Sequence, residues 1–245
     1  MDFINIVDIS QGSLEIMNPT TPDKVISAGR KAGMKAGDLV IEFGCGNGTI
    51  LTLWADELGV SGTGIDIRGS ACRSAEDAAK KSGPDTKITI INADASTVTP
   101  GDTPYDFAAC IGSSQIWGGV KEAIDAMSSF LTDEGRIIIG ERYWKTDRVS
   151  PEFAREWPEI LTEYEILGII RDAGFELEYV VRADADDWDR YESGIWEACL
   201  DWLRDNEGHL KADEIRDYLH MIQDEYLAFG REYMGWAMYI LTPGI

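Results

Sequence analysis

Short apolar runs alternate with stretches of helical periodicity along the first 145 residues. The apolar runs occupy residues 38–43, 60–67, 86–91, 105–111 and 135–141, and helical patterns cover 49–59, 70–83 and 120–131 between them. Strands that are joined through helices run parallel, because each helix returns the chain to the edge where the previous strand began. Right-handed crossovers then place helices on both faces of the sheet. The alternation therefore predicts a doubly wound α/β fold.

Further elements are expected on either side of this core. A helix is expected over 21–33, where Thr21 can cap its start and Gly33 its end. Ser70 can cap the helix over 70–83 in the same way. A helix over 162–175 and a strand over 175–182 follow the core, and two helical stretches near 190–204 and 211–230 lead to a final strand over 233–242.

The charge of the chain is strongly negative and unevenly distributed. The sequence holds 44 acidic and 22 basic residues, which gives a formal charge of -22. Residues 1–150 carry 21 acids and 14 bases, whereas residues 151–245 carry 23 acids and 8 bases. Such a field repels polyanions, and no run of Lys and Arg offsets it, so nucleic acid is not an expected partner. The acidic excess coincides with the place where the α/β alternation ends, which predicts one domain with an acidic helical insertion.

The cysteines and the apolar segments give no sign of a metal site, an export signal or a membrane span. Cys45, Cys72, Cys110 and Cys199 lie far apart and form no C-x-x-C pair. The chain has 2 His residues, so a zinc site has no support in the sequence. The N-terminus lacks a basic segment followed by an apolar one, and no window approaches 18 apolar residues. We therefore expect free thiols, a cytoplasmic protein, no metal and no membrane partner.

A glycine-rich turn marks the most informative junction. The run Glu42-Phe43-Gly44-Cys45-Gly46-Asn47-Gly48 joins the first strand of the core to its helix. Glycines let the backbone turn tightly and approach a ligand that side chains would exclude. The amides at the start of the following helix favour an anionic group such as a carboxylate or phosphate.

Acidic residues stand at the ends of the next two strands. Asp66 ends the second strand, where a carboxylate can accept hydrogen bonds from both hydroxyls of a ribose. Asp94 follows the third strand, where it can accept from the exocyclic amine of an adenine. Because the carboxyl ends of parallel strands meet at one edge, these residues predict a nucleoside-containing ligand there.

Two classes of cofactor fit such an edge. A nicotinamide dinucleotide fingerprint reads G-x-G-x-x-G and presents the helix start to a pyrophosphate. Here the glycines read G-C-G-N-G, and Glu42 would oppose a pyrophosphate but suits an ammonium group. In these residues the chain resembles the class I S-adenosylmethionine-dependent methyltransferases, whose motifs stand here as EFGCGNG, GTGIDI and NADA. Asn18-Pro19, CIGSSQIWGG, GERYW, DDWDRYE and REYMGW are similar to a branch of small-molecule methyltransferases without assigned substrates.

The resemblance implies roles for individual positions. Gly44, Cys45 and Gly46 would line the methionine part of S-adenosylmethionine, with Glu42 near its amino group. Asp66 would bind the ribose and Ile67 would pack on the adenine face. Asp94 and Ala95 would contact the adenine edge, and Cys110 and Ile111 would lie below the cofactor. The product would be S-adenosylhomocysteine.

The resemblance also implies a Rossmann-like, seven-stranded sheet of order 3-2-1-4-5-7-6 with an antiparallel last strand. We expect a single domain that comprises an N-terminal helical cap over 1–35, a cofactor-binding core over 36–182, the insertion over 183–231 and the last strand over 232–245. The insertion replaces the short hairpin that such enzymes usually have before the last strand, and it would form a wall of the acceptor site.

The acceptor itself is less well indicated by the sequence. Candidate residues are Glu141, which would act as a base, and the aromatic residues Trp117, Tyr143, Trp144, Trp188 and Tyr191. The segment after the fourth strand reads Cys110-Ile111-Gly112-Ser113 and lacks the N-P-P-[YF] of enzymes that methylate exocyclic amines of bases. Transfer of a methyl group to a small molecule is the favoured function. A nicotinamide-dependent oxidoreductase and a non-catalytic cofactor-binding subunit remain as alternatives.

Overall fold

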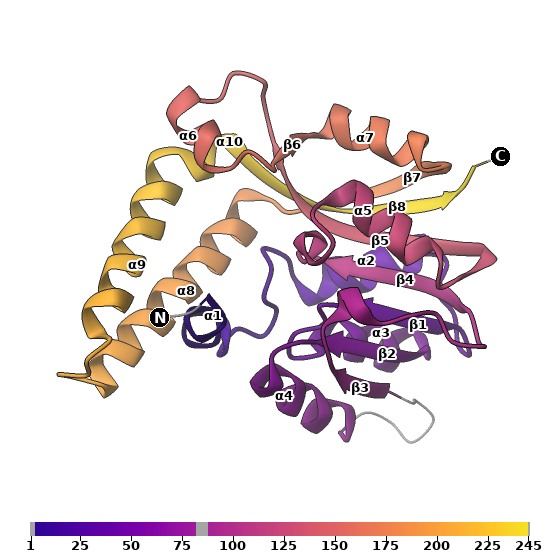
Figure 1. Cartoon of the computed structure of the whole chain (residues 1–245), viewed down its shortest axis with the longest axis horizontal. Helices are drawn as coiled ribbons and strands as arrows, with labels where there is room; N and C mark the ends of the chain where they lie inside the picture. The colour runs from indigo at the N-terminus through magenta and orange to yellow at the C-terminus, as the bar shows by residue number, and fades with distance from the viewer. Residues whose placement is uncertain (1–2, 82–87, 245) are drawn as a thin grey trace.

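The computed structural model describes residues 3–81 and 88–244, and a mixed β-sheet lies at its centre (Figure 1). The sheet order is β3-β2-β1-β4-β5-β8-β7, and a two-residue strand, β6, pairs with β5 off this path. The strands are β1 (Leu39–Phe43), β2 (Ser61–Asp66), β3 (Ile88–Asn92), β4 (Tyr105–Ile111), β5 (Leu131–Trp144), β6 (Leu161–Thr162), β7 (Phe175–Arg182) and β8 (Met234–Pro243). With β6 set aside, this is the predicted order 3-2-1-4-5-7-6.

The last strand reverses the direction of the sheet. β1 to β5 pair in parallel, whereas β8 runs antiparallel to both β5 and β7. The predicted antiparallel last strand is therefore confirmed. The reversal also means that β7 ends, and β8 begins, at the same edge as the carboxyl ends of β1 to β5.

Helices cover both faces of the sheet, as the alternation predicted. α2 (Pro22–Ala32) and α3 (Thr49–Leu58) pack on one face, and α5 (Val120–Ser128) and α7 (Glu163–Asp172) pack on the other. α4 (Gly69–Ala79) lies against β2 and β3, and α6 (Pro151–Glu156) follows β5. Each face therefore has its own hydrophobic core.

Local sequence signals set the ends of some helices and not of others. The Thr21 hydroxyl accepts a hydrogen bond from the Lys24 amide, and Gly33 adopts a left-handed conformation with φ 85°, so both predicted caps of α2 are confirmed. The predicted Ser70 cap is wrong, because α4 already begins at Gly69 and no side chain caps it. Ser70 instead donates a hydrogen bond of 2.7 Å to the Asp8 carboxylate.

The acidic insertion is a helical hairpin. α8 (Ala185–Asp205) and α9 (Ala212–Glu225) pack through their own small core, and a π-helical turn (Tyr226–Gly230) and α10 (Arg231–Tyr233) lead into β8. α1 (Phe3–Gln11) lies against α8 (Figure 1). The hairpin leaves the sheet at the carboxyl edge, because β7 ends there.

Lys24 connects α2 to the start of the hairpin. Its amino group donates to the carboxylate of Asp184 at 2.8 Å and also to that of Asp187, which is 3% exposed. The sequence offered no reason to treat Lys24 as more than a solvated charge. Its two acidic partners lie about 160 residues away along the chain.

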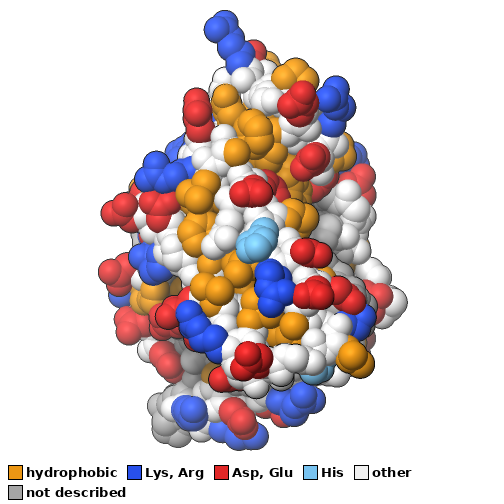
Figure 2. All heavy atoms as spheres, turned by 90° about the vertical axis from the view of Figure 1, so that its left-hand side faces the viewer, with side chains coloured by type: hydrophobic (Ala, Val, Ile, Leu, Met, Phe, Trp, Pro, Cys, Tyr) orange, Lys and Arg blue, Asp and Glu red, His pale blue; other side chains and the backbone are white. Residues whose placement is uncertain are grey.

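The outer face of the hairpin is partly apolar. Figure 2 shows a band of hydrophobic side chains along this side of the molecule, flanked by acidic and basic groups. Exposed apolar residues of this region are Leu200, Leu210, Met221 and Leu227. Within residues 3–81 and 88–244, no helix is long and apolar enough to cross a membrane.

Candidate functional site

The glycine-rich turn lies at the carboxyl edge and is tied to β2. The amides of Gly44 and Cys45 donate to the Ile65 carbonyl at 2.8 and 3.0 Å, and the Gly46 amide donates to Oδ2 of Asp66 at 2.8 Å. Gly44 and Gly46 have φ values of 70° and 55°, a region that favours glycine. A Cβ on Gly44 would come within 2.4 Å of the Ser113 hydroxyl. Glycine at this position therefore keeps the turn close to the end of β4.

Asp66 is well placed to bind hydroxyl groups. Its carboxylate is 6% exposed, and Oδ1 accepts from the Arg68 amide at 2.8 Å. The Arg68 guanidinium also approaches Oδ1, with Nε at 3.4 Å. A carboxylate oxygen can accept more than one hydrogen bond, so each oxygen retains capacity for a ligand.

Glu42 is buried beneath the turn without a complete set of partners. It is 1% exposed, and Oε2 has no hydrogen-bond partner among the described residues. Burial, followed by the negative charge of Asp66, raises the pKa of Glu42 to about 8, against a smaller opposing effect of the Leu51 amide. A ligand ammonium group nearby would supply the missing partner and favour the charged carboxylate.

The residues expected around an adenine lie at the ends of β2, β3 and β4. Ile67 is 56% exposed, so its side chain is free to cover an aromatic ring. Asp94 is exposed and accepts from the Ser96 amide and hydroxyl at 3.0 and 2.7 Å, which caps a short 3₁₀ turn. Ala95, Cys110 and Ile111 are buried beneath this surface.

An N-terminal segment crosses the carboxyl edge above these residues. The Asn18 amide donates to the Ile111 carbonyl at 3.1 Å, and Asn47 of the glycine-rich turn donates to the Leu14 carbonyl at 3.0 Å. Met17 lies beside Arg68, with 3.2 Å between its sulfur and Nη2. The sequence signalled this segment only through Asn18-Pro19, and the contacts show that it covers the turn.

The sequence predicted that the fifth strand ends at Glu141. In the structure β5 continues beyond this residue, so Glu141 lies within the strand. Its Oε2 accepts from the Ser114 hydroxyl and its Oε1 accepts from the Arg142 amide at 2.9 Å. β5 continues to Trp144, because its last residues pair with both β6 and β8. Glu141 is therefore held beside the loop that follows β4.

The aromatic candidates do not form one group. Tyr143 and Trp144 are neighbours in an extended strand, so their side chains point to opposite faces of the sheet. Trp144 packs at 5.5 Å on Phe153, whereas Tyr143 lies in the core on the other face. Trp117 packs edge-on against Phe43 at 5.1 Å.

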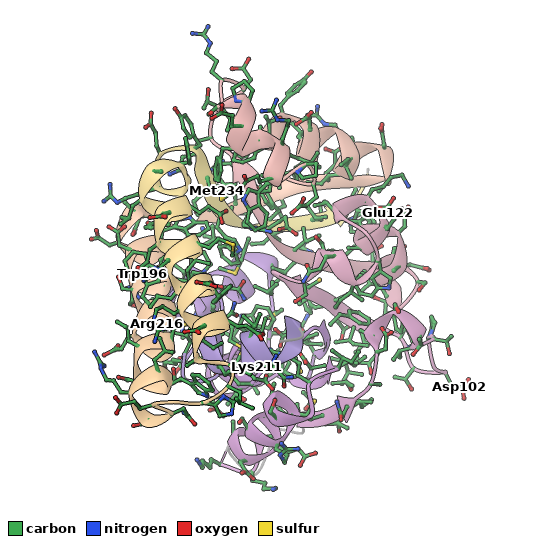
Figure 3. The ribbon with its side chains drawn as sticks, turned by 60° about the vertical axis from the view of Figure 1, so that its left-hand side comes forward. Asp102, Glu122, Trp196, Lys211, Arg216 and Met234 are labelled. Carbon is green, nitrogen blue, oxygen red and sulfur yellow. The ribbon has the colours of Figure 1, made fainter. Side chains whose placement is uncertain are left out.

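Trp188 and Tyr191 do come together, with partners that the sequence analysis did not select. The two rings are 6.2 Å apart, and Tyr226 stacks on Trp188 at 6.1 Å and meets Trp196 edge-on at 6.1 Å. Figure 3 shows Trp196 on α8 and Met234 at the start of β8. Trp188 is 7% exposed and belongs to the main core, so it has a packing role as well.

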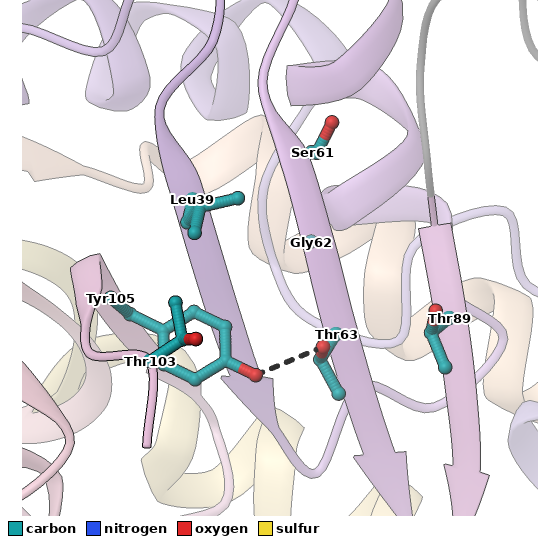
Figure 4. A pocket seen from close by; sticks show the side chains of 7 residues that line it. All are labelled: Leu39, Ser61, Gly62, Thr63, Thr89, Thr103 and Tyr105. Carbon is teal, nitrogen blue, oxygen red and sulfur yellow. Dashed lines mark hydrogen bonds between the residues drawn. The ribbon is translucent and has the colours of Figure 1, made fainter. Parts of the chain in front are cut away.

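A hollow at the opposite edge of the sheet is separate from this site (Figure 4). It is lined by residues at the amino ends of the strands, namely Leu39, Ser61, Gly62, Thr63, Thr89, Thr103 and Tyr105. The Tyr105 hydroxyl donates to the Thr63 hydroxyl at 3.1 Å across it. No group of three or more potential metal ligands occurs among the residues whose placement is described.

Comparison with known proteins gives consistent matches. A family model described as a methyltransferase domain matches residues 40–135. Protein YjhP of Escherichia coli K12 is 32% identical over 246 residues, which covers 98% of this chain and 99% of YjhP.

Two solved structures match over nearly their whole length. A SAM-dependent methyltransferase from Thiobacillus denitrificans in complex with S-adenosyl-L-homocysteine is 32% identical, with a TM-score of 0.91 and coverage of 99% of this chain and 100% of that chain. A SAM-dependent methyltransferase from Geobacter sulfurreducens in complex with S-adenosyl-L-homocysteine is 33% identical, with a TM-score of 0.91 and coverage of 98% of both chains.

Proposed function

The chain belongs to the S-adenosylmethionine-dependent methyltransferases, and on this premise we propose that it methylates a small-molecule acceptor by in-line displacement. Its cofactor is S-adenosylmethionine and its product S-adenosylhomocysteine. Because the chain belongs to this family, a methyltransferase is favoured over a nicotinamide-dependent oxidoreductase.

The residues at the carboxyl edge fit the cofactor. The unpartnered Oε2 of Glu42 suits the ammonium group of the methionine part, and the free acceptor capacity of Asp66 suits the ribose hydroxyls. The left-handed glycines leave the turn without side chains where the ligand approaches. These observations support the proposed contacts of Glu42, Gly44, Cys45, Gly46, Asp66, Ile67, Asp94, Ala95, Cys110 and Ile111.

The protein's contribution to the reaction is alignment and exclusion of water. The cofactor supplies an activated methyl group, so the main task of the chain is to hold a nucleophile in line with the bond that breaks. The segment around Asn18 covers the turn from one side, and α8 starts from the same edge. We propose that residues 1–35 and 183–231 act as the cap and the acceptor wall of a single domain. Closure by both would exclude water from the reacting groups.

A compact acceptor suits the electrostatics better than a nucleic acid does. The chain carries a formal charge of -22, and most of the acidic excess lies in the last part of the chain, which contains the hairpin. A polyanion would be repelled there. A neutral or cationic small molecule would meet aromatic and acidic side chains, including Trp188 and Tyr191.

Glu141 is proposed as a residue that orients the acceptor. Its hydrogen bond with Ser114 fixes the carboxylate beside the loop after β4, where the acceptor would approach. Replacement by Gln would then lower turnover and leave the affinity for S-adenosylhomocysteine unchanged. Equal turnover of the two proteins would remove Glu141 from the reaction.

Transfer of a labelled methyl group tests the proposed function directly. The protein is incubated with methyl-labelled S-adenosylmethionine and a bacterial cell extract that is divided into a small-molecule filtrate and a macromolecular fraction. We expect the label in the filtrate. Label in the macromolecular fraction alone would contradict a small-molecule acceptor. Binding of S-adenosylhomocysteine without label transfer to either fraction would favour a non-catalytic subunit.

A further inference from the structure

An acidic residue interrupts the aromatic stripe of α8. Glu192 follows Trp188 by four residues and precedes Trp196 by four, so the three side chains lie on one face of the helix. Trp188 and Trp196 pack toward the main core. Glu192 therefore points to the space between the hairpin and the sheet, and no described residue donates a hydrogen bond to its carboxylate.

The groups that face Glu192 do not neutralise it. Burial raises the pKa of Glu192, the negative charge of Glu225 on α9 raises it further, and Arg142 of β5 lowers it. The charge of Glu192 also acts on the hydroxyl groups of Tyr191, Tyr218 and Tyr226.

Arg142 makes its closest charged contact elsewhere. Its guanidinium stacks 4.3 Å above the ring of Trp157 and lies 3.7 Å from the Glu159 carboxylate. The Glu192–Glu225 pair therefore carries an excess of negative charge when both groups are ionised.

Glu192 is enclosed by neighbouring atoms although its side chain keeps some accessible surface. Burial is the largest cause of the raised pKa, which is about 8. Burial also raises the pKa of Glu225, against the influence of Trp157 and Arg142. The side chain of Glu192 is thus largely desolvated but not sealed from solvent, so a small ligand group can approach it.

An unpartnered donor lies on the same face of α8, one helical turn before Glu192. Trp188 is 7% exposed, and its Nε1 has no hydrogen-bond partner among the described residues. The ring stands between Tyr191 and Tyr226, both of which the charge of Glu192 reaches. A buried donor without a partner costs about 1–3 kcal/mol, so this N–H would be stabilised by an oxygen acceptor of a ligand whose cationic group meets Glu192.

The surroundings of Glu192 extend toward the cofactor side of the site. Burial raises the pKa of Tyr191, and the charge of Glu192 adds to this rise, whereas the nearby positive charges of Arg142 and Arg68 oppose it. Arg68 in turn pairs with Asp66, the proposed ribose ligand. Tyr191 therefore links the surroundings of Glu192 with the carboxyl ends of β2 and β5.

We propose that the acceptor is a primary or secondary amine and that Glu192 binds its nitrogen and takes up its proton. The inference rests on the proposed transfer to a small molecule and adds the class of acceptor and its base. Aromatic faces and two acids favour a cation over an anion, so a carboxylate or a thiolate would be repelled. An alcohol needs a far stronger base than a carboxylate.

The reaction balances with the groups present. The bound ammonium gives one proton to the Glu192 carboxylate, which frees the nitrogen lone pair. The lone pair forms a bond to the methyl carbon while the carbon–sulfur bond breaks, and the electron pair of that bond stays on sulfur. A pKa near 8 suits Glu192 for this exchange, because it holds a proton and releases it within the neutral range.

Acylation of the extract tests the class of acceptor. One portion of the small-molecule filtrate is treated with acetic anhydride and then with mild base, which removes O-acetyl but not N-acetyl groups. We expect label transfer from methyl-labelled S-adenosylmethionine to fall at least tenfold in the treated portion. Undiminished transfer would overturn the amine proposal and leave the small-molecule function intact. No transfer to the untreated portion would overturn the proposed function and this inference together.

Variants of α8 test the role of Glu192. Glu192→Gln is expected to lower turnover of the untreated filtrate by about 10²- to 10⁴-fold, the usual contribution of a general base. The wild-type rate should rise as pH approaches 8, and this rise should be absent in the variant. Glu197→Gln, an exposed change on the same helix, serves as the control and should leave the profile unchanged.

Binding measurements separate a chemical role of Glu192 from a structural one. S-adenosylhomocysteine should bind to both variants as it does to the wild type, and Glu192→Asp should restore part of the rate. A Glu192→Gln protein with wild-type turnover and pH profile would refute the proposal. Equal losses for Gln and Asp together with weakened cofactor binding would likewise show that Glu192 supports the fold instead.

Discussion

The Gly46 amide donates a hydrogen bond of 2.8 Å to Oδ2 of Asp66, so the last residue of β2 holds the glycine-rich turn in place. One carboxylate thus positions the part of the turn that would meet the methionine group, and its remaining acceptor capacity would serve the ribose. Two neighbouring parts of the proposed cofactor site depend on this single side chain.

Replacing Asp66 should weaken cofactor binding without unfolding the core. Asp66→Ala removes a charged acceptor, and we expect a loss of about 1.5–3 kcal/mol in binding of S-adenosylhomocysteine, the usual range for hydrogen bonds to charged groups. Titration calorimetry measures this loss. Asp77→Ala, on the exposed face of α4, is the control. Unchanged affinity of the Asp66 variant would argue against its role at the ribose.

The raised pKa of Glu42 predicts a dependence of stability on pH. The folded protein keeps this proton up to a pKa of about 8, whereas the unfolded chain releases it near the ordinary value of 4.5. The contribution of Glu42 to stability is therefore present below pH 4.5 and is lost as pH rises toward 8.

Glu42→Gln should remove this loss. As pH rises from 5 to 8, the melting temperature of the ligand-free variant should increase relative to that of the wild type by at least about 2–4 °C. This difference corresponds to roughly 1 kcal/mol for a chain of this size. Differential scanning fluorimetry across this range provides the measurement. Glu57→Gln, an exposed change on α3, should give a curve parallel to the wild type. A parallel curve for Glu42→Gln would contradict the raised pKa.

Gly112 should be needed for the N-terminal segment to cover the site. Its φ is 78°, and a Cβ there would come within 2.1 Å of the Asn18 side-chain oxygen. Gly174, with φ 82° and nothing within 4 Å of such a Cβ, provides a matched control.

The two alanine variants should therefore differ. Gly174→Ala should lose only the roughly 1–2 kcal/mol of left-handed strain. Gly112→Ala should lose more and should also weaken S-adenosylhomocysteine binding, because Asn18 must move. Thermal unfolding and calorimetry measure the two effects. Equal losses of stability and equal ligand affinities of the two variants would show that the Asn18 contact contributes to neither.

Lys24 should anchor the hairpin to α2. Lys24→Met leaves Asp187, which is 3% exposed, with less compensation for its buried charge. Since Lys24 is partly exposed and Arg190 also pairs with Asp187, we expect a loss of about 1–3 kcal/mol, below that of a fully buried pair. Amide hydrogen exchange in α8 should become faster. Lys121→Met, which breaks an exposed pair with Asp125, should leave stability almost unchanged, because solvent screens this pair. Similar effects of both substitutions would mean that Lys24 is an ordinary surface charge.

The sequence by itself determined the parallel core and its turn. Each strand from β1 to β5 stands out as a local apolar run, and the caps at Thr21 and Gly33 act on backbone groups only a few residues away. The positions of Glu42, the glycines and Asp66 follow from the same local order, because parallel strands bring their carboxyl ends to one edge. Periodicity and spacing along the chain were sufficient for these features.

Only the tertiary structure decided what covers that edge. The extension of β5 through Trp144, which separates Tyr143 from Trp144, results from pairing with β8, far away in the sequence. The contacts of Asn18 with Ile111 and of Lys24 with Asp187 join residues 93 and 163 positions apart. In the sequence Glu192 is one more acid of an acidic helix; only the folded chain buries it and brings Glu225 of α9 and Arg142 of β5 near it. A local sequence pattern cannot predict such partners, because the burial and the electrostatic surroundings of these side chains depend on segments that meet only in the folded chain.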